Sequence, residues 1–325
     1  MEINKEELKE NIGNHVKSHF LKYLYFGLFC LSAFCIYVVY QIFIPTKYLP
    51  TDKVFTITKD QSGEEIFINL KQDGFIKSVF WAKIVAKGFE RVNRAKFYRG
   101  EYNFEASDSL YKVIYKITKR PVSLAVLIPE GFTKVQIADR LAKFINKFNR
   151  KDFLEKAEEG YLFPDTYYFY AFSTNDEILA EFEKKFNKNA LVKFGRLPTD
   201  DEVIIASMIE REAKDPEDMK IISGIIQNRL KIDMPLQLDA TVLYGKGAWK
   251  DRTYYSDLKH DSDYNTYLNK GLPIGPISNP GINALSAAIK PQKTKYFYYL
   301  TGRDGKMYYA VTGAEHLKNI AKYLR

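Results

Sequence analysis

The feature that most constrains this chain is an apolar run near its amino terminus. Residues 23–44 carry no charged side chain, and a stretch of about 20 apolar residues is what a helix needs to cross a bilayer. The four tyrosines of the run lie toward its two ends, where interfacial aromatic side chains are found. No small-residue cleavage site follows before Pro45, so the run predicts an uncleaved, single transmembrane helix rather than a signal peptide.

The segments that flank this run bear on its orientation. Four lysines before it are diluted by four glutamates, and Lys47, Lys53 and Lys59 follow it. Flanking charge alone therefore does not decide the orientation. Two other features favour one orientation: the amino-terminal tail is short and the trailing domain long, and both cysteines are confined to the run. They predict that residues 1–22 are a cytoplasmic tail and that the domain lies outside the cytoplasmic (inner) membrane.

The composition of the chain excludes several classes of function. With 325 residues, of which 46% are hydrophobic, the chain can bury a large core and is not disordered. The formal net charge is +9, but Lys and Arg are scattered and no nucleic-acid-binding motif accompanies them, so we expect no nucleic-acid partner. Because Cys30 and Cys35 both lie in the apolar run, the rest of the chain offers no disulfide, cysteine nucleophile or cysteine metal site. We predict neither a cofactor nor a metal.

The region after the anchor predicts a small α+β module within an α+β fold. The expected elements are strands at 54–58 and 65–70, a helix at 76–87 that ends at Gly88, and two strand–turn–helix units at 96–119 and 122–148, whose helices are entered through Ser107 and Thr133. Two such units side by side would form one module. Because the region holds no cluster of titratable side chains, a binding or spacing role is more typical of it than catalysis.

Two acids, Glu210 and Glu212, end an otherwise apolar helix, and a Thr199–Glu202 capping box predicts that the helix starts at Asp200. If the helix has its usual period of 3.6 residues, either acid could be half-buried beside the apolar residues. A carboxylic acid in apolar surroundings stays protonated nearer neutral pH, as a general acid requires. The alternative is a pair of solvated glutamates at a helix end.

Other segments have structural explanations beside functional ones. Residues 159–168 gather aromatic side chains that either stack on sugar rings or pack in a core, and Asp165 could cap the following turn. A loop rich in Gly and Pro leads to Asn279, which we expect to be the N-cap of a helix at 282–289. Strands at 296–300 and 306–311 form a hairpin ahead of a capped last helix, where His316 is expected to be an ordinary polar residue of the surface.

Taken in order, six motifs resemble the YceG-like family of endolytic murein transglycosylases: EGYLFPDTYYF, ASMIEREA, IISGIIQNRL, MPLQLDATVLYG, YNTYLNKGLPIGPISNPG and the terminal TGAEH. The resemblance covers roughly residues 98–324. It departs from the family's Gln-Thr-Asp-Pro-Thr pattern at Leu238 and Ala240, while Gln237 and Asp239 match. Six motifs in order are far more specific than any one of them.

The resemblance implies a membrane-anchored lyase that cuts nascent peptidoglycan glycan strands, with a LysM-like part around IPEGFT. It implies a membrane-proximal α+β region at 45–150 and a mixed α+β catalytic domain with a helical core at 151–325. Glu210 matches the family's catalytic glutamate, and the small side chains of Ala206 and Ser207 would leave room for a sugar beside it. The residues expected to line the substrate groove are Tyr161, Phe163, Asp165, Gln237, Asp239, Asn265, Tyr267, Pro273, Ser278 and Asn279.

The expected reaction cleaves the bond between N-acetylmuramic acid and N-acetylglucosamine without water and leaves a 1,6-anhydro end. Two alternatives stay open. A hydrolase would need a second carboxylate about 5 to 9.5 Å from the first, for which Asp165, Asp239 and Glu212 are candidates. A wall-binding scaffold without catalysis would have no use for a protonatable acid on a half-buried helix. The expected partners are the glycan strands, the cytoplasmic membrane and proteins of wall synthesis.

Overall fold

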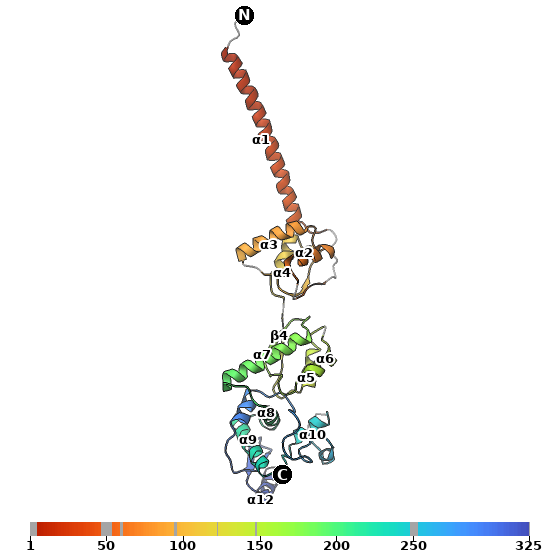
Figure 1. The fold of residues 1–325 in the computed structure, drawn as a ribbon, viewed down its shortest axis with the longest axis vertical. Helices are drawn as coiled ribbons and strands as arrows, with labels where there is room; N and C mark the ends of the chain where they lie inside the picture. The colour runs from red at the N-terminus through yellow and green to blue at the C-terminus, as the bar shows by residue number, and fades with distance from the viewer. Residues whose placement is uncertain are drawn as a thin grey trace. The chain divides into compact units, whose positions relative to one another are not determined.

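The computed structural model describes residues 5–46, 54–58, 61–93, 96–121, 123–146, 148–247 and 253–324. Lys47, Lys53, Lys59 and the first residue of the strand expected at 122–128 lie outside the described residues. The described part of the chain has a mixed α+β fold, with twelve α-helices and six short strands (Figure 1). The chain divides into two units, Met1–Val122 and Ser123–Arg325.

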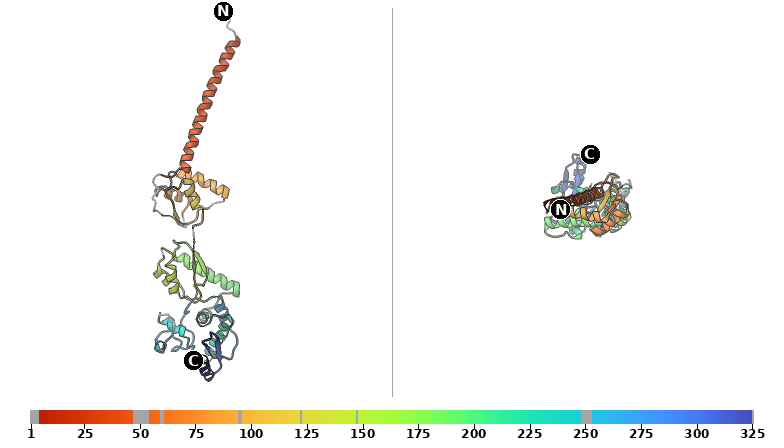
Figure 2. Two further views of the ribbon diagram at one scale, coloured as in Figure 1. Left: turned by 180° about the vertical axis from the view of Figure 1, so that it is seen from behind. Right: turned by 90° about the horizontal axis from the view of Figure 1, so that it is seen from above.

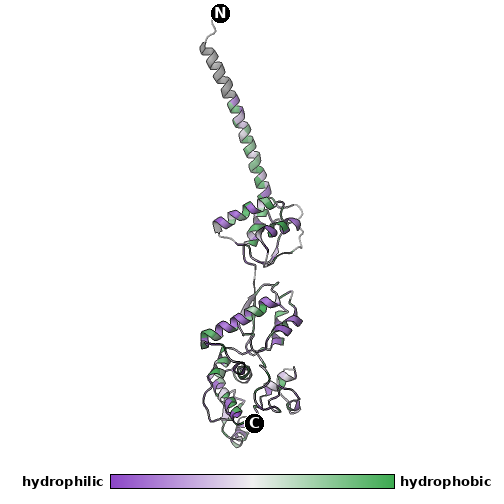
Figure 3. Cartoon of the chain, in the orientation of Figure 1, coloured by the Kyte–Doolittle hydropathy of each residue, from purple (hydrophilic) through white to green (hydrophobic). Residues whose placement is uncertain are grey.

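The first unit begins with one long helix, α1 (Lys5–Phe43). Its stretch His19–Phe43 is long and apolar enough to cross a membrane, and no side chain of this stretch is buried. This part of the helix exposes many large apolar side chains, and green residues recur along it (Figure 3). The helix is therefore consistent with the expected single-pass membrane anchor.

The rest of the first unit is a small α+β core. It contains β1 (Val54–Ile57), α2 (Gly63–Gln72), α3 (Val79–Asn93), β2 (Gly100–Asn103) and α4 (Leu110–Ile117), and β1 pairs antiparallel with β2. The strand expected at 65–70 is wrong, since this stretch belongs to α2. Ser62 and Glu65 form a capping box there, which starts a helix. The N-cap of α4 is Ser109 rather than Ser107, and α3 runs through Gly88 to Asn93.

The second unit opens with β3 (Leu124–Leu127), α5 (Lys134–Leu141), α6 (Arg150–Lys156), β4 (Thr166–Phe169) and α7 (Asn175–Phe194). Because β3 pairs antiparallel with β4, and β2 with β1, the two expected strand–turn–helix units do not join into one module. Ile137, Phe153 and Phe182 share one hydrophobic core, which includes residues on both sides of position 150.

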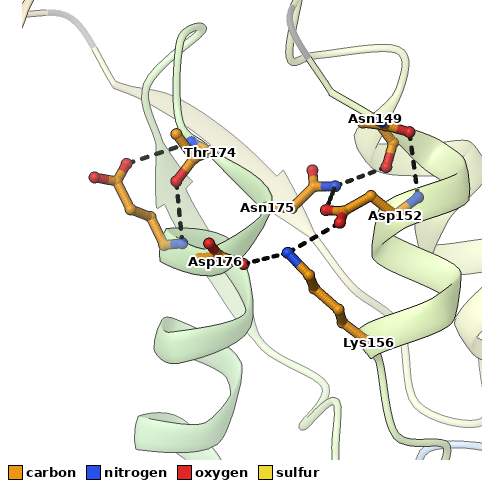
Figure 4. A network of polar contacts seen from close by, with 7 residues as sticks. Asn149, Asp152, Lys156, Thr174, Asn175 and Asp176 are labelled. Carbon is orange, nitrogen blue, oxygen red and sulfur yellow. Dashed lines mark hydrogen bonds and ion pairs between the residues drawn. The ribbon is translucent and has the colours of Figure 1, made fainter.

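A polar network ties α6 to α7 at the edge of this core. Asn175 donates from Nδ2 to the Asn149 carbonyl and to Asp152, both at 2.7 Å, and Lys156 bridges Asp152 and Asp176 (Figure 4). Asn149 also caps α6. The two helix starts are therefore held together by hydrogen bonds as well as by apolar packing.

The remainder of the second unit is mainly helical. It contains α8 (Asp200–Glu212), α9 (Pro216–Lys231), α10 (Asp239–Gly245), a 3-10 turn (Asp257–Lys259), α11 (Ile282–Ile289), β5 (Tyr298–Thr301), β6 (Met307–Ala310) and α12 (Gly313–Tyr323). Helix α11 packs against α8 and α9. The expected hairpin of β5 and β6 is confirmed, and Arg229 of α9 donates to the carbonyl of Phe297, which directly precedes β5. The carboxyl-terminal part of the chain, which includes the hairpin, is drawn in blue (Figures 1 and 2).

Candidate active site

Helix α8 carries Glu210 in its last turn. The helix starts where the sequence predicts, because the Thr199 hydroxyl accepts from the Glu202 N–H at 3.3 Å and Glu202 accepts from the Thr199 N–H at 2.8 Å. All seven residues at 203–209 are buried. Glu210 is the first residue after this buried stretch and is only half-buried, so the helix delivers a carboxyl to the edge of the core.

Among the described residues, one donor fixes the carboxyl of Glu210. Its Oε2 accepts from the main-chain N–H of Gly281 at 2.9 Å, and Gly281 is the N-cap of α11. Burial raises the pKa of Glu210 to about 7, and the negative charge of Glu130 adds to this rise, whereas the Gly281 N–H and Arg211 oppose it. A carboxyl with this pKa can both release and accept a proton near neutral pH.

Glu210 opens into a cleft of about 850 Å³. The cleft is walled by the turn after β3, the end of α8, the start of α9 and the β5–β6 hairpin. Its lining residues are Glu130, Gly131, Glu210, Arg211, Glu212, Ala213, Lys214, Asp215, Asp218, Met219, Asn283, Thr301, Gly305 and Met307. Most of them are polar or charged, so the cleft suits a polar ligand better than an apolar one.

Ser207 holds the loop that leads to Gly281. Its hydroxyl accepts from the Ile277 N–H at 3.0 Å, and its carbonyl accepts from the Ser278 hydroxyl at 2.9 Å. Ser207 and Ala206 are both fully buried. The room for a sugar expected beside these two small side chains is therefore filled by protein, and the open space lies beyond the end of α8.

Asn279 is not the N-cap that the sequence predicts, because Gly281 caps α11 instead. The Asn279 side chain is fully buried. Its Oδ1 accepts from the N–H groups of Gly160 and Leu162 at 2.9 and 2.8 Å, and its Nδ2 donates to the Phe132 carbonyl at 2.9 Å. Asn279 thus ties together three loops that are far apart in the sequence.

Glu159 is a second partly buried acid, and its contacts could not be read from the sequence. It accepts from the Lys134 N–H and the Tyr244 hydroxyl, each at 2.9 Å, and from Asn279 Nδ2 at 2.6 Å. Burial raises its pKa to about 7. Because both of its oxygens are occupied by protein donors and it is not among the residues that line the described cleft, its role is to join loops.

Glu212 also lies at the end of α8, but its side chain contacts the hairpin. Its Oε2 accepts from the Tyr299 hydroxyl at 2.8 Å, and burial raises its pKa above the usual value. It lines the cleft with Glu210 but is fastened to β5. Each acid accepts one hydrogen bond within the described part of the chain, but Glu212 accepts its bond from a tyrosine hydroxyl of the hairpin and Glu210 from a main-chain N–H.

The structure places the first three predicted groove residues away from the cleft. The Tyr161 hydroxyl donates to Asp200 at 2.5 Å, Phe163 is buried in the core, and Asp165 is paired with Lys185. None of the three is among the described residues that line the cleft with Glu210.

The other predicted groove residues fall into two groups. Gln237 and Asp239 are exposed, and Asp239 accepts from the Tyr267 hydroxyl at 2.6 Å. Asn265, Pro273 and Ser278 are buried, as is Asn279, and Asn265 donates to two main-chain carbonyls. The structure therefore brings Asp239 and Tyr267 together, and joins Ser278 to the Glu210 helix.

Glu130 and Gly131 line the cleft, although neither is a site residue that the sequence predicts. Both lie in the IPEGFT motif, which reads as a helix entry when it is taken alone. The available signal was an acid beside a glycine within a motif of the family, but nothing in the sequence places it near Glu210.

The fold and the cleft together define a class of protein. An α+β chain with one long apolar amino-terminal helix, and a polar cleft around a half-buried carboxyl of raised pKa, is typical of an anchored enzyme with carboxyl acid–base chemistry. The chain belongs to the YceG-like family, whose model matches residues 55–322.

Known proteins similar to the chain include two named relatives. It is 33% identical to the endolytic murein transglycosylase of Bacillus subtilis (strain 168), over 78% of this chain and 80% of that protein. It is 28% identical to the endolytic murein transglycosylase of Streptococcus pneumoniae serotype 2, over 96% of this chain and 66% of that protein. It also matches the crystal structure of a YceG-like protein from Listeria monocytogenes with a TM-score of 0.54 and 31% identity, over 82% of this chain and 98% of that one.

Proposed function

We propose that the chain is an endolytic murein transglycosylase, a lyase that cuts peptidoglycan glycan strands at internal bonds. Membership of the YceG-like family and the activity for which two relatives are named support this proposal. The observation that carries it is the placement of Glu210: a carboxyl of pKa about 7 at the wall of a polar cleft, with one oxygen fixed by Gly281.

In the proposed mechanism, Glu210 acts twice. The protonated carboxyl gives its proton to the oxygen of the bond between N-acetylmuramic acid and N-acetylglucosamine, and the bond from that oxygen to C1 of the muramyl residue breaks. The C6 hydroxyl of the same residue bonds to C1, and Glu210 takes up the hydroxyl proton. The result is a 1,6-anhydro end and a carboxyl restored to its starting state, without water.

A hydrolase remains the second candidate, because Glu130 lines the same cleft as Glu210. In a two-carboxylate mechanism the second acid activates water or attacks the sugar, and the product is a reducing end. The chemical form of the new end therefore separates the two mechanisms. A wall-binding scaffold without catalysis would produce neither a 1,6-anhydro end nor a new reducing end.

The test is mass analysis of the ends released from purified peptidoglycan by the full-length protein in detergent. Glu210→Gln keeps the shape of the side chain but cannot exchange the proton, so we expect no 1,6-anhydro ends and an unchanged circular dichroism spectrum. Glu155→Gln, which changes an exposed acid on α6, is the matched control and should keep full activity. Anhydro ends at the wild-type rate from folded Glu210→Gln protein would refute the assignment.

The proposal extends to the rest of the chain. Residues 1–22 would lie in the cytoplasm, residues 23–44 would span the inner membrane, and the enzyme would act outside it on nascent strands beside proteins of wall synthesis. Residues 45–150, with the LysM-like part, would help to hold the strands. Among the predicted groove residues, the exposed Gln237 and the linked pair Asp239 and Tyr267 are the best placed to meet a long ligand.

A further inference from the structure

The turn that carries Glu130 is fixed against the loop that carries Gly281. The Gly131 N–H donates to the Asn279 carbonyl at 2.9 Å, and Arg211 Nη1 donates to the Gly131 carbonyl at 3.2 Å. Gly131 has φ +73°, the left-handed region that favours glycine. The main chain directly after Glu130 is thus held at both its N–H and its carbonyl, so the side chain starts from a defined position.

The backbone conformation of Gly281 does not require a glycine, but the space around its Cα does. Its φ of −80° and ψ of 178° suit any residue. A Cβ at this position, however, would lie 2.0 Å from Glu130 Oε1 and 2.6 Å from its Cδ, which is far inside van der Waals contact. The space that a side chain would need is therefore occupied by the carboxyl of Glu130.

The same glycine also holds the other acid. Its N–H donates to Glu210 Oε2 at 2.9 Å, so one residue contacts both carboxyls. Glu130 is exposed at the rim, and it makes no hydrogen bond or ion pair with any described residue. The negative charge of Glu130 is therefore not neutralised by a described residue. A like charge nearby disfavours the ionised form of Glu210, the half-buried acid.

We propose that Glu130 is a positioning residue for the acid step: its charge, seated on Gly281, keeps the proton on Glu210 until the glycosidic oxygen is in place. This role rests on the proposed function. The Gly281 N–H and Arg211 act in the opposite direction, and they let Glu210 ionise once the proton has been used. The other charged groups around the cleft are Glu212, Lys214, Asp215 and Asp218.

The first test is the pH dependence of kcat/KM, which reports groups of the free enzyme. In Glu130→Gln the alkaline limb should move to lower pH by about half a unit or more, so that activity falls at pH 8 and changes little at pH 5. Glu130→Asp, which withdraws the charge by one methylene, should move it less. Glu155→Gln should leave the limb in place.

Gly281→Ala is the second variant. It keeps the N–H that Glu210 needs and an allowed backbone, but its methyl group must displace Glu130. The alkaline limb should move in the same direction as in Glu130→Gln. A limb that stays in place in both folded variants would overturn the proposal.

A direct titration separates this inference from the proposed function. The ¹³C signal of the Glu210 carboxyl, assigned by its absence in Glu210→Gln, is followed against pH in full-length protein without substrate. A lower midpoint in Glu130→Gln supports the proposal even if the wild type released no anhydro ends. An unchanged midpoint together with loss of activity at every pH would mean that Glu130 acts on the substrate itself, and the positioning role would be wrong.

Discussion

At the scale of single residues, two carboxyls of similar pKa have different roles. Burial raises the pKa of both Glu159 and Glu210 to about 7. The oxygens of Glu159 are occupied by Lys134, Tyr244 and Asn279, whereas Glu210 has one donor and faces the cleft. A raised pKa therefore identifies a catalytic candidate only together with an open path to a ligand.

The pKa of Glu159 predicts how stability depends on pH. Because its pKa is higher in the folded state than the usual value of 4.5, the folded protein binds more protons, and stability is lost as pH rises from about 4.5 to about 7. The full effect is at most roughly 3 kcal/mol. The melting temperature should fall between pH 5 and pH 8, and it should fall less in Glu159→Gln, which keeps a neutral side chain there. An equal fall in both proteins would contradict this.

Asn279 predicts a large loss of stability. Asn279→Ala would leave the buried N–H groups of Gly160 and Leu162 without their partner, whereas the Phe132 carbonyl would keep the hydrogen bond from the main-chain N–H of residue 279. An unsatisfied buried polar group costs about 1 to 3 kcal/mol, so for the two N–H groups we expect a total of at least about 2 kcal/mol in urea denaturation. Asn269→Ala removes an exposed asparagine and is the control, which should cost far less.

The sequence could identify Glu210 but not its surroundings. Helical period and the capping box follow from neighbouring residues, so they place Glu210 at the end of a buried helix. The partners of Asn279 lie about 120 or more residues away in the chain. No local pattern reports such a contact, and a loop asparagine ahead of a helix therefore reads as a cap.

At the scale of elements, the type of a short apolar segment was predicted wrongly where its apolar residues showed neither a helix nor a strand period clearly. Residues 65–70 suit a strand by composition, but Ile66, Phe67 and Leu70 lie on one face of α2 once Ser62 caps it. Helix α8 and the terminal hairpin were predicted well, because a capping box and turn glycines mark their ends, whereas the long helix α7 was not predicted. Strand pairing, by contrast, depends on contacts between distant segments.

The cap of α8 gives a prediction at this scale. Thr199→Ala removes the hydroxyl that accepts from the Glu202 N–H, and the loss of such a cap costs about 1 kcal/mol. Thermal unfolding should show this loss. The cap lies at the opposite end of α8 from Glu210, so kcat at 25 °C should stay near the wild-type value. A tenfold fall in kcat would instead show that the start of the helix positions Glu210.

At the scale of the whole molecule, the unit boundary predicts which fragments fold. A fragment that starts at Ser123 keeps β3, α5 and the core that they share with β4, whereas one that starts at residue 151 loses them. We expect cooperative thermal unfolding, followed by circular dichroism, for the first fragment only. Cooperative unfolding of the shorter fragment would show that the core does not need β3.

The apolar helix predicts the topology in cells. If α1 anchors the chain with its domain outside, protease added to intact spheroplasts should degrade the carboxyl-terminal domain and spare a tag at the amino terminus. Protection of the domain with loss of the tag would reverse the orientation. A cytoplasmic protein should remain intact as the control for membrane integrity.

The order in which the cleft is built has a consequence for biosynthesis. Its walls come from the turn at Glu130, the end of α8, the start of α9, Asn283 of α11 and the hairpin that includes Met307. A chain leaves the ribosome from its amino terminus, so Glu210 emerges long before the N–H that orients it. A chain that stops before Gly281 would therefore carry Glu210 without the main-chain donor that holds its carboxyl.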